Sequence, residues 1–290
     1  MEYLKPLKLK ELFTMLKSSG KYGSESAGRG KYIRYIAGGT DLAVQIRDSG
    51  IKPSTLIDLS AIDELKGLSL KDGTIRIGSA VTIAEIAESK EIPACLKVGA
   101  LSIGSPQIRN LATIGGNICN ASPCGDTLTP LLVLKAEFEL ASDSGNRLVR
   151  AEDFFTGPKK TVLKENEVLK AVHIDKNNCT GVSFFKKIGK RNAQIISQVN
   201  VSVYMELNKD KKIVKIRAAA GSVAPVPLRL KGLEEALKGA EVKDFGLEDI
   251  YGFVNSDIKP ISDVRASSDY RRRVTASLIY DILEEAANVN

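Results

Sequence analysis

The segment "RNLATIGGNICNASPCGD", from Arg109 to Asp126, combines paired glycines, short polar side chains and two cysteines. It lies between an apolar stretch and the run "TLTPLLVLKA". Its side chains are too small to fill a hydrophobic core, and its glycines allow the backbone to approach another group closely. The segment therefore predicts a loop that holds a ligand.

A second glycine pair, Gly38-Gly39, occurs in "YIAGGTDL". Paired glycines allow successive backbone N–H groups to point into one concavity, and they remove the Cβ atoms that would keep a phosphate away. Thr40, Thr113 and Asn117 add side chains that form hydrogen bonds. Two such loops can hold a pyrophosphate from both sides if the fold brings them together. Either pair alone is also typical of a plain tight turn.

Other nucleotide-binding motifs do not match. The stretch "GSESAGRGK" has the glycine spacing of a phosphate loop, but Arg29 stands where lysine is needed and Gly30 where serine or threonine is needed. No G-x-G-x-x-G follows a predicted strand, which excludes the dinucleotide-binding fingerprint of a Rossmann fold.

Composition describes an ordinary globular protein of 290 residues with 43% hydrophobic and 27% charged residues, enough for two domains. No apolar run approaches the length of a membrane span, and "MEYLKPLKLKELF" has no signal-peptide core. We therefore expect a cytoplasmic location and no membrane partner. The net charge is +7, but the basic residues are dispersed apart from "RRR" at 271–273, so we expect no nucleic-acid partner. An anionic ligand or partner fits this surface.

Histidine and cysteine patterns predict no metal site and no catalytic side chain in this chain. The one histidine, His173, lies in the strand-like run "LKAVHI", which is more typical of a structural role. Cys119 and Cys124 do not have the CxxC spacing, and the other two cysteines lie far away. The pair is therefore interpreted as small residues that line a loop.

Hydrophobic periodicity predicts two regions that differ in secondary structure. The first contains helices, for example one in "LKLKELFTMLKSSG" and one that begins with a capping box at Thr82 and Glu85, and a hairpin of "EFELAS" with "RLVRAEDFF". From about Gly181 three strand-like runs, "GVSFFKKIG", "IISQVNVSVYMEL" and "KIVKIRAAAGSVA", precede three helical patterns. The polar stretch "DKNNCT" indicates a boundary between them.

Taken together, "YIAGGTDLAVQIR" and "GSPQIRNLATIGGNICNASPCGDTLTPLLVLKAEFEL" resemble the FAD-binding medium subunit of the xanthine dehydrogenase family of molybdenum hydroxylases. The stretches "FFTGPKKTVLKENEVLKAVHI", "FFKKIGKRNAQIISQVNVSV" and "AAAGSVAPVPLRL" are similar to the same family in the same order, and "SDYRRRVTASLI" resembles its C-terminal signature. The resemblance covers nearly the whole chain.

The resemblance implies an α+β fold: the two-subdomain FAD-binding fold of the vanillyl-alcohol-oxidase type, followed by a C-terminal domain with a three-stranded antiparallel sheet and helices. It implies an FAD-binding domain over residues 1–176, with subdomains of about 1–56 and 57–176, and a C-terminal flavoprotein domain over 177–290.

The resemblance also implies which residues contact FAD. Ile103 stands where the family often has a larger apolar residue near the flavin, and Lys186 is the alternative to Lys187 for placing positive charge near the cofactor. The implied contacts are Tyr35, Ile36, Ala37, Gly38, Gly39, Thr40, Asp41 and Leu42 in the first loop, Thr113, Ile114, Gly115, Gly116 and Asn117 in the second, and Ile103, Asp126, Leu169 and Lys187 elsewhere.

The implied function is electron transfer, with a molybdenum-pterin large subunit and an iron–sulfur small subunit as partners and NAD as one acceptor. Because His173 is poorly placed for a covalent link, we expect non-covalent FAD. The alternatives are a stand-alone FAD-dependent oxidoreductase of the same fold and a non-enzymatic protein that binds a nucleotide or nucleic acid.

Overall fold

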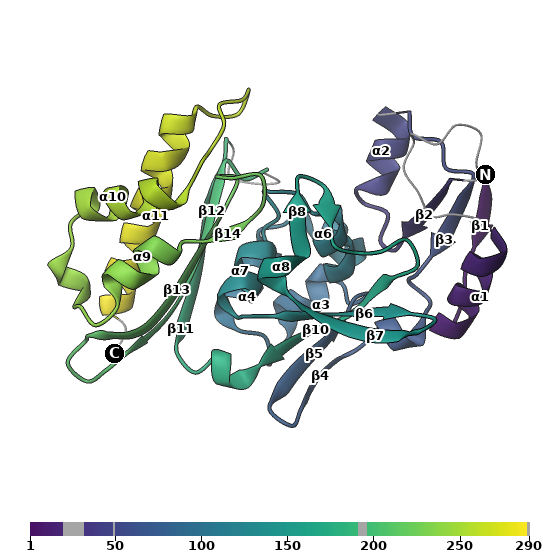
Figure 1. The fold of residues 1–290 in the computed structure, drawn as a ribbon, viewed down its shortest axis with the longest axis horizontal. Helices are drawn as coiled ribbons and strands as arrows, with labels where there is room; N and C mark the ends of the chain where they lie inside the picture. The colour runs from purple at the N-terminus through teal and green to yellow at the C-terminus, as the bar shows by residue number, and fades with distance from the viewer. Residues whose placement is uncertain (20–31, 49, 191–195, 289–290) are drawn as a thin grey trace.

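The computed structural model describes residues 1–19, 32–48, 50–190 and 196–288. Three main sheets follow one another along the molecule, with a small parallel sheet at one end and the C-terminal sheet and helices at the other (Figure 1). The phosphate-loop near match at 23–31 lies outside the described residues. Within them, no helix is long and apolar enough to cross a membrane.

The first sheet is parallel, with strand order β1-β3-β2. Helix α1 forms because Leu9, Leu12, Phe13 and Leu16 recur at helical spacing and cover this sheet from one side. The elements of this layer are β1 (Glu2–Leu4), α1 (Leu9–Ser19), β2 (Ile33–Ile36), α2 (Leu42–Asp48) and β3 (Thr55–Asp58). Strand β3 therefore continues slightly beyond the predicted end of the first subdomain at 56.

The second sheet has the order β4-β5-β10-β6-β7 and is antiparallel. Alternate side chains such as Ile75, Ile77, Phe138 and Val172 are buried against helices, as the period of a strand requires. Its strands are β4 (Leu68–Lys71), β5 (Thr74–Gly78), β6 (Glu137–Ser142), β7 (Gly145–Arg150) and β10 (Val168–Asp175). The helices of this region are α3 (Ile83–Glu88), α4 (Ala94–Leu101), α5 (Pro106–Leu111), α6 (Ile114–Asn120), α7 (Leu128–Val133) and α8 (Ala151–Phe154), with the 3-10 turn η1 (Asp63–Leu65).

Two local predictions in this region are confirmed and one is corrected. The capping box of α3 is present, with Thr82 accepting from the backbone of Glu85 and the Glu85 carboxylate accepting from Thr82. The predicted hairpin is β6 with β7. Its second strand ends at Arg150, however, and "AEDF" forms the one-turn helix α8 before β8 (Phe155–Gly157) and β9 (Lys160–Thr161).

The C-terminal sheet is antiparallel, in the order β11-β12-β13-β14. The sequence predicts three of its strands; the fourth, β14, has two residues and is too short for a recognisable pattern. Helices α9–α11 cover one face, while α4 and α7, which belong to the region of the second sheet, pack on the other. The elements are η2 (Lys176–Asn178), β11 (Val182–Ile188), β12 (Val199–Leu207), β13 (Ile213–Gly221), β14 (Leu228–Arg229), α9 (Lys231–Leu237), η3 (Val242–Asp244), α10 (Leu247–Asp257) and α11 (Ser268–Ala287).

Candidate functional site

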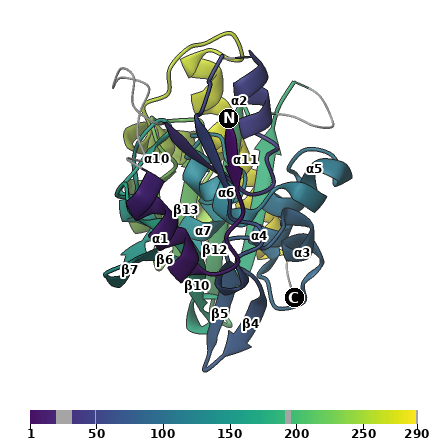
Figure 2. The same ribbon diagram turned by 90° about the vertical axis from the view of Figure 1, so that its right-hand side faces the viewer.

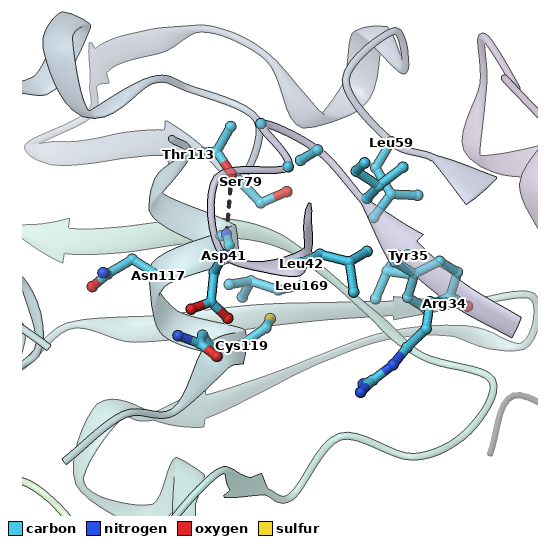
Figure 3. Close-up of a pocket in the computed structure, with 18 of the residues that line it drawn as sticks. Arg34, Tyr35, Asp41, Leu42, Leu59, Ser79, Thr113, Asn117, Cys119 and Leu169 are labelled. Carbon is cyan, nitrogen blue, oxygen red and sulfur yellow. Dashed lines mark hydrogen bonds between the residues drawn. The ribbon is translucent and has the colours of Figure 1, made fainter. Parts of the chain in front are cut away.

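A cavity of about 900 Å³ opens between the loop after β2, the start of α6 and the strand β10. Figure 3 shows Arg34 and Tyr35 at one side of this pocket and Asp41, Asn117 and Cys119 at the other. The predicted site residues that line it are Tyr35, Ile36, Ala37, Gly38, Gly39, Thr40, Asp41, Leu42, Ile103, Thr113, Gly115, Gly116, Asn117 and Leu169.

The first glycine loop has backbone donors without acceptors. In the described part of the chain, the N–H groups of residues 38–41 donate to no protein acceptor, although all four residues line the cavity. Gly39 has φ +70°, a backbone conformation that favours glycine. Unpaired N–H groups around one concavity attract an anion, so this loop is suited to a phosphate group.

A close backbone contact brings the two glycine loops together. A Cβ on Gly38 would lie 1.8 Å from the carbonyl oxygen of Leu111, which is the last residue of α5. Leu111 is followed directly by Ala112 and Thr113 at the start of the second loop. Only glycine permits this approach, and it places the two distant segments on one cavity.

The second glycine loop does not present its backbone donors as the sequence predicts. The N–H of Ile114 donates to Val81, that of Gly115 to Ser79, and that of Gly116 to the Thr113 side chain, at 3.0, 2.9 and 3.0 Å. A Cβ on Gly115 would lie 2.6 Å from Ser79, whereas on Gly116 it would approach only Thr113 Oγ1 within 4 Å, at 3.0 Å. The absence of a side chain at Gly115 therefore permits close packing against Ser79. The absence of one at Gly116 leaves space for a ligand in the cavity.

Asn117 supplies a donor that the backbone of its loop does not. Its Oδ1 accepts a hydrogen bond of 2.6 Å from Thr127 Oγ1, which fixes the orientation of the amide. The amide nitrogen donates to no acceptor among the described residues, and Asn117 lines the cavity. This arrangement leaves an N–H₂ group for a ligand.

Arg34 is a lining residue that the sequence prediction missed. Its Nε is buried and has no hydrogen-bond partner among the described residues, and its guanidinium lies 5.4 Å from the centre of the Tyr32 ring. Figure 3 shows this side chain beside Tyr35 in the pocket. The signal that was available is a basic residue just before the glycine loop, but a strand pattern alone does not show on which side Arg34 projects.

Cys119 lines the cavity, but it lies in helix α6 rather than in the loop that the sequence predicts. Its side chain is exposed at the cavity rather than buried in the core. Cys124 lies elsewhere and contacts the Ser122 hydroxyl at 3.1 Å. Among the described residues, no group of three or more His, Cys, Asp or Glu side chains is arranged to hold a metal ion.

Three predicted site residues do not line the cavity. Ile114 is fully buried in the core. Asp126 and Lys187 form a buried ion pair of 2.6 Å between the two regions, and Asp126 also accepts from Ser197 at 2.6 Å. Lys187 donates to the carbonyl of Ser102 at 2.7 Å, next to Ile103 of the cavity wall. The ion pair therefore lies behind the wall rather than in it.

The family described as the FAD binding domain in molybdopterin dehydrogenase matches residues 1–176. The chain belongs to this family. The CO dehydrogenase flavoprotein C-terminal domain matches residues 183–286. The protein is thus an FAD-binding medium subunit of the molybdenum hydroxylase family and an oxidoreductase component, as the sequence resemblance predicts.

Relatives span nearly the whole chain. The putative xanthine dehydrogenase FAD-binding subunit XdhB of Escherichia coli is 34% identical over 260 residues, which cover 87% of this chain and 88% of that one. The nicotinate dehydrogenase FAD-subunit of Eubacterium barkeri is 30% identical, with 86% and 88% coverage. A carbon monoxide dehydrogenase structure from Hydrogenophaga pseudoflava has a TM-score of 0.85 at 28% identity and covers 99% of this chain and 96% of that chain.

The cavity fits the cofactor of this FAD-binding family. Its volume lies within the usual range of cofactor sites. The donors of residues 38–41 suit a pyrophosphate, and the buried Nε of Arg34 provides a further unpaired donor at the same cavity. Apolar walls at Ile103 and Leu169 suit a flat ring system.

Proposed function

We propose that this cavity binds FAD without a covalent link, with the pyrophosphate on residues 38–41 and Asn117 and the isoalloxazine ring in contact with Ile103 and Leu169. The unpaired donors of the first glycine loop are the observation that carries this placement. Gly116 permits close approach, while Asp126 and Lys187 act behind the wall.

Among the described residues, neither the histidine nor the cavity cysteine is suited to a covalent link with FAD. His173 lies on the outer face of the second sheet, where its Nε2 is 3.0 Å from the Glu139 carboxylate. The Cys119 thiol lines the cavity, but among the described residues no cationic side chain is paired with it to stabilise the reactive thiolate. Binding therefore depends on hydrogen bonds and packing.

The protein residues bind and orient the cofactor and exclude water from one side, and they carry out no bond-breaking step themselves. When bound, FAD supplies redox chemistry between an iron–sulfur small subunit and an acceptor such as NAD. A molybdenum-pterin large subunit completes the proposed complex, which we place in the cytoplasm. The substrate pocket of such a complex belongs to the large subunit, so this chain alone hydroxylates nothing.

The test compares the isolated chain with the chain plus its two partner subunits. We expect yellow protein whose flavin passes a filter after denaturation, and oxidation of NADH by the isolated chain with an artificial acceptor. Hydroxylation of a purine, an aldehyde or an N-heterocycle should appear only with the partners. A lone chain that hydroxylates such substrates at the rate of the complex would instead be a stand-alone flavoenzyme.

A further inference from the structure

Three consecutive carbonyl oxygens in the loop between α4 and α5 accept hydrogen bonds from cationic side chains. Lys187 Nζ donates to Ser102 at 2.7 Å, and Arg109 Nη1 donates to Ile103 at 3.1 Å and to Gly104 at 3.2 Å. Together these bonds connect three neighbouring carbonyl groups of the loop to two cationic side chains. Charge-assisted hydrogen bonds are the stronger kind, so this loop is firmly fixed.

The helix that carries Arg109 is anchored at its C-terminal end, where the Leu111 backbone packs against Gly38 and the Ala112 carbonyl accepts from the Ile83 N–H at 2.8 Å. None of the residues of α5 is buried, and Figure 2 shows this helix at the outer edge of the molecule. Gly104 has φ +49°, and a Cβ there would lie 2.8 Å from Ile108 Cγ2, so the turn into α5 is tight. The Arg109 side chain therefore ties a surface helix back to the loop that precedes it.

The fixed loop carries Ile103, the side chain that forms part of the cavity wall. Arg109 itself does not line the cavity, but its guanidinium donates a hydrogen bond to the backbone carbonyl of Ile103. Two consequences follow for a ring bound against Ile103: the wall keeps its position, and a positive charge lies behind it. A positive charge near a flavin favours the reduced, anionic ring.

We propose that Arg109 is a positioning residue for the flavin: it fixes Ile103 against the isoalloxazine ring and raises the reduction potential of the cofactor. This proposal rests on the proposed function, since it requires FAD in the cavity. It differs from the glycine-loop contacts because Arg109 acts through Ile103 and the backbone, without touching the cofactor.

The experiment compares wild type with Arg109→Met, Arg109→Lys and a matched control, Arg150→Met, in the assembled complex and in the isolated chain. Arg150 is an exposed arginine that pairs with Glu152 and Asp153. For each variant the measurements are FAD affinity by flavin fluorescence, the visible absorption band of bound flavin and the midpoint potential.

We expect Arg109→Met to bind FAD about tenfold more weakly, to lower the midpoint potential and to blur the fine structure of the flavin band. Arg109→Lys should recover most of each property, because an ammonium group can donate to the same carbonyls. Arg150→Met should match wild type. A merely structural role would change the unfolding temperature without changing the spectrum or the potential.

A second variant keeps the test decisive if Arg109→Met folds poorly. Arg109→Gln removes the charge but keeps amide donors, and it replaces the methionine variant. Ile103→Ala should alter the flavin band in the same way as Arg109→Gln, and combining the two should change the band little further, because the wall side chain is already gone. Wild-type spectrum and potential in Arg109→Met, or a lysine variant no better than methionine, overturns the proposal. Failure of wild type to bind FAD overturns the proposed function instead.

Discussion

The two glycine loops look alike in sequence and differ in what their backbones do. Residues 38–41 leave their N–H groups without acceptors at the cavity, whereas the N–H groups of 114–117 are used inside the protein. In the second loop both glycines line the cavity, but a Cβ on Gly115 would overlap Ser79, whereas a Cβ on Gly116 would meet only Thr113 Oγ1. A glycine pair therefore indicates close approach, but the approach is to a ligand in one loop and largely to the protein itself in the other.

The largest effect should come from Gly115→Val. Its side chain would overlap Ser79, so we expect a loss of about 3 kcal/mol in the free energy of unfolding. Urea unfolding of the chain without FAD measures this directly. A stable apo-chain that has lost only its flavin would mean that Gly115 faces the ligand after all.

Gly116→Val separates ligand approach from packing. A Cβ at this position meets only Thr113 Oγ1, so the apo-chain should unfold close to the wild-type midpoint. Affinity for FAD should fall more than about tenfold, because the valine side chain keeps the pyrophosphate from its donors. Fluorescence titration with FAD is the measurement, and wild-type affinity would remove the second loop from the binding site.

Gly39→Ala and Gly73→Ala form a matched pair for the first loop. Both residues have positive φ, +70° and +74°, so alanine should destabilise each by about 1 kcal/mol. Gly73 lies in the turn between β4 and β5, with nothing near its missing Cβ. A Cβ on Gly39 would lie 3.2 Å from Ile36 Cδ1, so thermal unfolding should shift in Gly39→Ala by as much as in Gly73→Ala or slightly more. Only Gly39→Ala should weaken FAD binding, severalfold. Equal FAD affinity in the two variants contradicts a special role for the first loop.

The smallest effect concerns an ion pair between two side chains at the edge of the cavity. Glu167 lines the cavity and accepts two hydrogen bonds from Arg147, at 2.7 and 2.8 Å, and these bonds lower the pKa of its carboxyl below 4.5. A carboxyl group whose pKa is lower in the folded than in the unfolded state stabilises the protein at pH values above its unfolded-state pKa. This stabilisation is lost as the pH falls through the folded-state pKa. Unfolding midpoints of wild type should therefore fall more steeply below about pH 4.5 than those of Glu167→Gln. Parallel curves would show that the pair contributes nothing to stability.

Sequence patterns predict most elements of this fold, because periodicity and capping act locally. The helix at Leu9–Ser19, the capping box at Thr82 and the hairpin of β6 with β7 follow from neighbouring residues alone. The two-residue strand β14 and the single turn α8 were missed, since elements this short exist only through their tertiary contacts. The loop predicted from Arg109 to Asp126 is corrected as well: this segment contains the end of α5 and all of α6, a helix that its paired glycines disfavour locally.

The site is predicted less completely than the fold. The glycine loops reach one cavity as expected, because each motif carries its own backbone geometry. The direction of a long side chain depends on packing between distant segments. For that reason Arg34 was missed at the cavity, and Asp126 and Lys187 were expected there although they pair with each other behind its wall.

The C-terminal sheet has a consequence for how the chain unfolds. Residues Val199 to Met205 of β12 are all buried, because helices α9–α11 cover one face of the sheet and α4 and α7 of the FAD-binding domain cover the other. Neither half of the molecule can open at this strand without exposing apolar surface to water on at least one side. Amide protons of β12 should accordingly exchange with solvent only when the whole chain unfolds, which makes the two regions one cooperative unit.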